Sequence, residues 1–214
     1  MIWAFDTTGP WVAVAAHGGD RLLGVRRRDV RLRHNEMLQQ ITGDLRDDCG
    51  GQLPHTIALC VGPGSFTGTR VGTAFAAGLA EAVGAQVIPV SSFEVAASLA
   101  PPDSVRIGVA IPIVQEIWCL ARLVRTHRGW QEESLDELPV DRIRAGGEEM
   151  PLVVPWGEAP GAILPGDEWQ PAQAVLDAAI LCPDHERIEP ASVRIRYIGP
   201  SQAERNFRAR QREH

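Results

Sequence analysis

The sequence predicts an α/β fold of two lobes, in which mixed sheets are flanked by helices and the second lobe is reduced. The first hundred residues read as three short strands followed by a helix, a strand, a second helix and another strand. The dipeptide Pro101-Pro102 then interrupts the chain, as expected at a domain boundary. Apolar alternation resumes at Val105, which indicates that a second half opens in the same way as the first.

The elements of the first half follow from turn residues and apolar periodicity. Three antiparallel strands, separated by tight glycine-containing turns, are expected over 1–7, 11–17 and 21–27. Helices with apolar residues at three- and four-residue spacing are expected over 34–48 and 66–83. Buried strands are expected over 56–61 and 86–90, and a short helix capped by Ser91-Ser92 extends to Ala100.

The second half is expected to contain strands over 105–111 and 116–124, loops and short strands over 130–170, a helix over 171–181 and a final strand over 193–198. The two lobes should therefore span 1–100 and 101–214. Three antiparallel strands, a helix, a strand and a helix form half of an actin-type core. The fold class expected is consequently the actin-like ATPase (RNase H-like) fold.

Composition and charge exclude several classes of protein. The chain has 214 residues and a hydrophobic content of 44%, and it lacks the run of about 20 apolar residues that a membrane helix needs. Its start has no basic segment typical of a signal peptide, so we expect a cytoplasmic protein with no membrane association. A net charge of −6 disfavours tight nucleic-acid binding by the chain alone. The arginines near its end form either a solvated terminus or a docking surface for tRNA or an acidic partner.

The strongest local signal is the segment VGPGSFTGTRVG at 61–72, where a buried strand enters a helix through a glycine-rich turn. Such a helix start can bind an anion through free N–H groups, but the chain contains no lysine and hence no P-loop lysine. The spacing leaves a tight structural turn and a phosphate-facing loop both open. The candidates to face a nucleotide or phosphate are Asp6, Thr7, Thr8, Gly62, Gly64, Ser65, Thr67 and Arg70.

The same segment resembles the signature of the TsaB (YeaZ) family, within the actin-like ATPase superfamily. The opening strand at 2–8, the helix start at 33–38 and the segment at 89–97 agree with it, so the resemblance covers about residues 1–100. The chain departs from the family at 111–113, where Ile-Pro-Ile stands in place of the usual Asp-Ala-Arg.

The resemblance implies a non-catalytic dimerisation and activating subunit in the synthesis of N6-threonylcarbamoyladenosine in tRNA. Such a subunit binds and supports a TsaD-like catalytic subunit, helps to recruit a TsaE-like ATPase, contacts tRNA through the complex and forms a homodimer when alone. No cofactor is expected on this chain, since ATP and metal belong to the partner subunits. Its own residues agree: none of the six histidines are four apart, and 111–113 lacks the acids and glycines of a second phosphate hairpin.

The helix over 66–83 is apolar nearly all round, which requires cover on more than one side. We expect the bulky stripe of Val71, Phe75 and Leu79 to pack on the sheet. The small stripe of Gly72 and Ala76 would then face a second helix, either that over 34–48 or one of a partner. The resemblance implies a four-helix interface with the partner. The candidate partner-binding residues are Met37, Leu38, Ile41, Leu45, Thr73, Ala74, Ala77 and Gly78.

Two further functions stay open at this stage. The first is an enzyme of the actin-like superfamily, either an ATP-dependent small-molecule kinase or a glycopeptidase-like enzyme. The second is a divergent paralogue that only self-associates. The unusual Ile111-Pro112-Ile113 segment, which replaces the family's Asp-Ala-Arg, is the feature that supports it.

Overall fold

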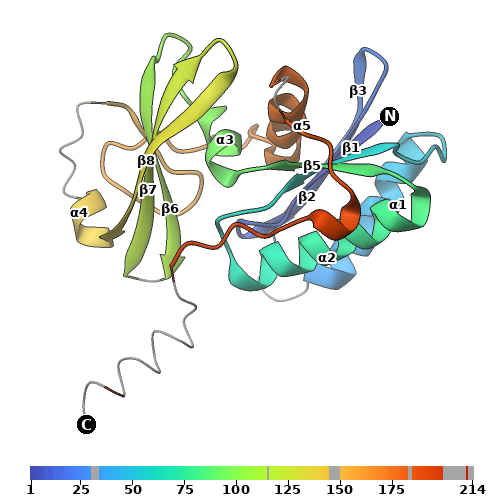
Figure 1. The fold of residues 1–214 in the computed structure, drawn as a ribbon, viewed down its shortest axis with the longest axis horizontal. Coiled ribbons are helices and arrows are strands. Elements are labelled where there is room, and N and C mark those ends of the chain that lie inside the picture. Colours follow the sequence, from blue (N-terminus) through green and yellow to red (C-terminus); the bar gives the residue numbers. More distant parts are fainter. Residues whose placement is uncertain (30–33, 115, 145–149, 183–184, 200–210, 212–214) are drawn as a thin grey trace.

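The computed structural model describes residues 1–29, 34–114, 116–144, 150–182, 185–199 and 211, and it has the two lobes that the sequence predicts (Figure 1). The sheet of the first lobe has the strand order β3-β2-β1-β4-β5. Its strands are β1 (Ile2–Asp6), β2 (Trp11–Gly18), β3 (Arg21–Asp29), β4 (Thr56–Cys60) and β5 (Gln86–Val90). The first three strands are antiparallel and the last two run parallel to β1, so the sheet is mixed.

The second sheet repeats this topology in a shorter form, with the order β8-β7-β6-β9. Its strands are β6 (Arg106–Val114), β7 (Ile117–Thr126), β8 (Gly129–Pro139) and β9 (Leu152–Val153), and β9 lies parallel to β6 as β4 does to β1. The expectation of loops and short strands over 130–170 is therefore confirmed for β9, but it is wrong for β8, which is a strand of 11 residues. This edge strand carries exposed acidic residues at successive positions and a register shift against β7, which together obscured its alternation in the sequence.

Helices cover both faces of the first sheet (Figure 1). The helices α1 (His34–Asp48) and α2 (Phe66–Val83) pack on the face that carries Trp3 and Phe5. The opposite face carries Ala4 and is covered by α5 (Pro171–Leu181). Odd-numbered residues of β1 belong to one core cluster and Ala4 to the other, because successive side chains of a strand point to opposite faces. No helix in the described ranges is long and apolar enough to cross a membrane.

Helix α1 buries three of the residues expected to bind a partner. Leu38, Ile41 and Leu45 have relative exposures of 0%, 1% and 0% and belong to the core of the first lobe. They cannot contact a partner in this fold, so their assignment to an interface is corrected. The physical reason is that one apolar stripe on a short amphipathic helix is fully used by the sheet beneath it.

Helix α2 is rotated relative to the sequence-based expectation. Its small stripe of Gly72, Ala76 and Ala80 is buried against the sheet, whereas Val71 and Phe75 are only partly buried beside it. The small residues allow the helix axis to approach the strands closely, and the bulky ones fill the space on either side of the contact line. The expectation that the small stripe faces a second helix was therefore wrong. The bulky stripe does pack against the core of the first lobe, as expected, with the centroid of the Phe75 ring 5.9 Å from that of Phe5 in β1.

The C-terminal part of the chain returns to the first lobe, so the expected second lobe over 101–214 is too long. Helix α5 lies on β1 and β2, and the short 3₁₀ helix η1 (Pro190–Ser192) lies on α2. The second lobe keeps the four strands β6 to β9 and the helix α4 (Val140–Arg144). The sheet's apolar outer face explains the return, since it would be exposed without α5.

Residues 193–198, which we call the C-terminal strap, cross from the first lobe to the second along α2 (Figure 1). Val193 packs on the core of the first lobe and Ile198 on that of the second. Arg196 pairs with Glu132 of β8 at 2.7 Å, and its backbone N–H donates to the Val61 carbonyl. The strap is extended without being a strand of either sheet, so the final strand expected here is absent.

The burial of α1 leads to a stability prediction. Leu38→Ala should lower the free energy of unfolding by about 2–5 kcal/mol, because it leaves a cavity in the core of the first lobe. The exposed neighbour Gln39 offers a matched control, and Gln39→Ala should change the same quantity by less than about 0.5 kcal/mol. Urea denaturation followed by circular dichroism measures both. Equal, small effects would show that Leu38 faces solvent.

Candidate functional site

The turn after β1 is built around a buried carboxylate. Asp6 is 1% exposed, and its Oδ1 accepts hydrogen bonds from the Thr8 backbone N–H at 2.8 Å and from the Thr8 hydroxyl at 2.7 Å. Thr7 donates its hydroxyl proton to the Gly68 carbonyl at 2.7 Å, which ties the turn to α2. The acid is therefore held by its own turn.

The glycine-rich segment packs directly on this turn. A Cβ placed on Gly64 would overlap the Thr8 carbonyl oxygen, and one on Gly72 would overlap the Thr7 hydroxyl. The Ser65 backbone N–H also donates to the Thr8 carbonyl at 2.7 Å. Backbone and side chains thus fill the space between the β1–β2 turn and the start of α2. Of the two interpretations of the loop, this geometry corresponds to a tight structural turn.

Several polar groups at the start of α2 form hydrogen bonds within the chain. The Ser65 hydroxyl caps the helix by accepting from the Gly68 N–H at 3.2 Å. Gly62 has φ of +99°, which favours glycine, and its carbonyl accepts from the Ser92 N–H at 2.9 Å. Gly64 and Ser65 are thus brought against Thr8 as packing partners, whereas Gly62 lies against Thr69 and the Arg196 carbonyl.

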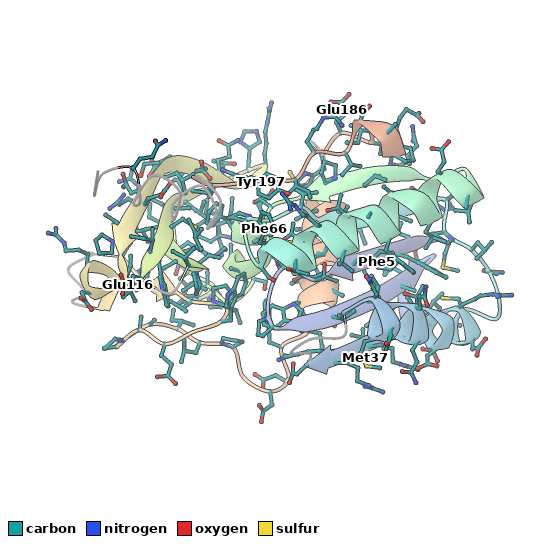
Figure 2. The ribbon with its side chains drawn as sticks, turned by 90° about the horizontal axis from the view of Figure 1, so that it is seen from below. Phe5, Met37, Phe66, Glu116, Glu186 and Tyr197 are labelled. Atoms are coloured by element: carbon teal, nitrogen blue, oxygen red, sulfur yellow. The ribbon has the colours of Figure 1, made fainter. Side chains whose placement is uncertain are left out.

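Thr67 and Arg70 lie apart from this packed turn, on the exposed side of α2. The Arg70 guanidinium carbon lies 3.5 Å from the centroid of the Phe66 ring, and its Nε–H donates to the Tyr197 hydroxyl at 2.7 Å. Figure 2 shows Phe66 and Tyr197 beside each other, where the strap passes the start of α2. Arg70 is therefore held at the surface by the strap, and is not directed at the Asp6 carboxylate.

Burial controls the electrostatics of the turn. Desolvation raises the pKa of Asp6, and the hydrogen bonds from Thr8 act in the opposite direction. Desolvation and the neighbouring Asp6 also raise the pKa of the Cys60 thiol, whose sulfur lies 3.2 Å from the Ser92 hydroxyl. Cys60 is therefore an unreactive, protonated side chain at neutral pH. Within the described residues, no three His, Cys, Asp or Glu side chains gather as a metal site would require.

A cluster of tryptophans between the lobes was not predicted from the sequence. Trp11 makes edge contacts with Trp156 and with Trp169, each with centroids 5.5 Å apart, and the Arg27 guanidinium carbon lies 5.1 Å from its ring. Trp156 packs against the cores of both lobes. The three rings come from distant segments, so their spacing along the chain gave no signal. Only the high tryptophan content, 6 of 214 residues, pointed to such a feature.

The outward side of α2 is lined by small residues. Ala74 and Gly78 are exposed, and Thr73 and Ala77 are partly exposed. A Cβ on Gly78 would meet no atom within 4 Å, so the space above the helix is open. Met37 of α1 is partly exposed and lies on the side of the molecule seen in Figure 2. Five of the eight expected partner-binding residues are thus accessible.

Comparisons with known proteins agree with this architecture. Residues 20–106 match the model of the family described as TsaD, tRNA N6-adenosine threonylcarbamoyltransferase. A search of curated proteins found no match. Among solved structures, an uncharacterized protein with similarity to peptidase YeaZ from Pseudomonas aeruginosa superimposes with a TM-score of 0.76 at 23% identity, over 92% of this chain and 99% of that chain. YeaZ from Pseudomonas aeruginosa gives a TM-score of 0.74 at 22% identity, with the same coverage of 92% and 99%.

The protein is therefore of the α/β class with two mixed sheets and an actin-like fold, as expected from the sequence. More particularly, its fold is that of YeaZ over nearly its whole length, and part of its first lobe matches the TsaD family model. The resemblance stated from the sequence motifs is confirmed.

Two glycines of α2 provide a test of the packed turn. Gly72→Ala should destabilise the fold by about 1–3 kcal/mol, because the new methyl group overlaps Thr7 and forces α2 away from β1. Gly78→Ala, on the open side of the same helix, should be neutral or stabilising by up to about 1 kcal/mol through helix propensity alone. Thermal and urea denaturation distinguish the two. Equal effects would mean that the start of α2 is not pressed against the turn.

The buried Asp6 predicts a pH dependence of stability. Because its pKa is raised in the folded state, the folded protein binds this proton more tightly than the unfolded chain does. The contribution of Asp6 to the free energy of unfolding is thus full below its ordinary pKa of 3.8 and is lost as the pH rises through the raised value. The Asp6→Asn variant has no carboxyl group to ionise there, so it does not lose this contribution. The difference in the free energy of unfolding between variant and wild type should therefore shift in favour of the variant as the pH rises. Parallel stability–pH curves from urea denaturation would contradict a raised pKa.

Proposed function

We propose that this chain is the non-catalytic dimerisation and activating subunit of the tRNA N6-threonylcarbamoyladenosine machinery, which binds and supports a TsaD-like catalytic subunit. The observation that carries the proposal is the open, small-residue side of α2, formed by Thr73, Ala74, Ala77 and Gly78. Small side chains let a second helix approach closely, so that its ridges fit the groove along α2. The likeness of fold to YeaZ supports the same assignment.

The ends of this surface carry opposite charges, which supports self-association when the catalytic subunit is absent. Arg70 lies near the start of α2 and Glu81 near its end, about 16 Å apart along the helix axis, and both are exposed. An antiparallel pair of α2 helices would bring Arg70 of each copy toward Glu81 of the other, around a centre close to Ala74 and Ala77. Such an arrangement is self-complementary, as a twofold dimer requires.

The interior of the molecule supports a non-catalytic role. The start of α2 packs directly on Thr7 and Thr8, the two residues that follow Asp6, and leaves little room for a phosphate at this turn. In the second lobe Ile111 is buried in the core, at the position where a second phosphate hairpin would need acids and glycines. We assign ATP and metal to the partner subunits, with a TsaE-like ATPase among them. Contact with tRNA would be made through the complex, in line with the chain's net charge of −6.

Co-purification with the TsaD-like protein of the same organism tests the proposal. The wild-type chain should form a stoichiometric complex, and Gly78→Arg should abolish it, since a long charged side chain blocks the close approach of a helix. Gln131→Arg, which adds the same charge at an exposed position on β8, should leave the complex intact. Circular dichroism confirms that both variants fold.

The remaining outcomes separate the alternatives. A chain that self-associates but does not bind the TsaD-like protein would be the divergent paralogue. Saturable ATP turnover by the isolated chain, abolished by Asp6→Ala, would establish the actin-like kinase in place of a partner subunit.

A further inference from the structure

A cavity of about 370 Å³ lies between the two lobes, on the opposite side of the first sheet from α2. Its walls come from α3 (Ser92–Ala97), from α5 and from the hairpin that joins β7 to β8. Both its size and its place between two lobes are typical of sites for small molecules. The assignment of the α2 surface to a protein partner makes no use of this cavity.

Opposite charges face the cavity from opposite lobes. Asp177 belongs to α5 of the first lobe, and Arg125 belongs to β7 of the second. Arg125 is held in place because its Nη1 donates to the Pro102 carbonyl at 2.8 Å and its guanidinium carbon lies 4.7 Å from the centroid of the Trp130 ring. Among the residues that the structure describes, neither Asp177 nor Arg125 takes part in an ion pair. The cavity thus separates a carboxylate from a fixed guanidinium.

The second acid of the cavity, Glu94, is already engaged. Its Oε2 accepts from the backbone N–H and the hydroxyl of Ser91 at 2.9 and 2.7 Å, and its Oε1 lies 3.1 Å from the His185 Nε2. These contacts keep the pKa of Glu94 low despite its burial. Asp177 differs, since desolvation raises its pKa and only the charge of His17 opposes the rise. A cation placed in the cavity would therefore stabilise the Asp177 carboxylate.

Apolar side chains lie around the two charges. Ala97 of α3 and Ala178 of α5 line the cavity, and Leu181 at its edge is 77% exposed. An apolar group of a ligand would bury this surface together with its own. A ligand that meets all three features carries a cation, an anion and an apolar group within a small volume.

We propose that this inter-lobe cavity binds a free α-amino acid with an apolar side chain, with the ammonium group on Asp177, the carboxylate on Arg125 and the side chain against Ala97, Ala178 and Leu181. The ligand contacts both lobes at once. Its binding consequently stabilises their relative position, because a ligand that binds only the folded, assembled cavity adds its binding free energy to that state. The inference is independent of the partner-subunit role.

Titration calorimetry of the full chain with leucine and with phenylalanine tests the site. Both should bind saturably, whereas N-acetyl-leucine, which lacks the ammonium group, and leucinol, which lacks the carboxylate, should bind at least about tenfold more weakly, a loss of about 1.4 kcal/mol per missing ion pair. Asp177→Asn and Arg125→Gln should each weaken leucine binding by a similar factor.

Matched variants outside the cavity serve as controls. Asp103→Asn and Arg142→Gln remove the same charges from exposed positions and should leave leucine binding unchanged. Arg125→Lys keeps the positive charge and should retain part of the affinity for leucine. It tests the role of the charge in the case that Arg125→Gln alters the fold. Absence of saturable binding of both amino acids, equal binding of leucinol or N-acetyl-leucine, or wild-type affinity in Asp177→Asn would each overturn the proposal.

Discussion

The close contact between the start of α2 and the turn after β1 determines much of the rest of this structure. Because Gly64 and Gly72 have no side chain, the backbone there can approach Thr8 and Thr7 closely. The Thr7 hydroxyl also donates a hydrogen bond to the Gly68 carbonyl. A helix this close to a strand must present its small residues inward, so Gly72 and Ala76 lie on the sheet. The rotation that this imposes directs Ala74 and Gly78 outward. One packing contact thereby joins α2 to the β1–β2 turn and leaves exposed the surface that we propose for a partner.

Two sets of contacts join the lobes. The tryptophan cluster around Trp11 fills space between them, and the C-terminal strap links the Val61 carbonyl to Glu132 of β8 through Arg196. Both sets of contacts are made within the chain itself. They favour a fixed arrangement of the lobes, whereas a phosphotransferase closes its lobes around a substrate. A fixed arrangement of the lobes is compatible with the partner-binding surface that we propose on α2.

The inter-lobe cavity lies where these internal contacts leave space. Its two charged walls belong to different lobes, and among the described residues Asp177 and Arg125 form no ion pair with each other. The α2 surface and the cavity are on opposite sides of the first sheet, since α2 packs on the face with Phe5 and α5 on the face with Ala4. Protein binding at one and ligand binding at the other are thus sterically compatible.

The sequence by itself determined the order and type of most elements, because turn glycines, apolar alternation and helical periodicity are local properties. It also placed Asp6 and residues of the segment at 61–72 in one set of candidate phosphate-facing residues, of which the structure brings Thr8 against Gly64 and Ser65. Only the tertiary structure decided which side of α2 faces the sheet, since small and bulky stripes alternate around that helix and either could pack inward. Three differences from the sequence-based expectation have the same cause: Leu38, Ile41 and Leu45 lie in the core, α5 packs on the first lobe, and three distant tryptophans contact one another. Burial depends on contacts between segments far apart in the chain, which periodicity within one segment cannot specify.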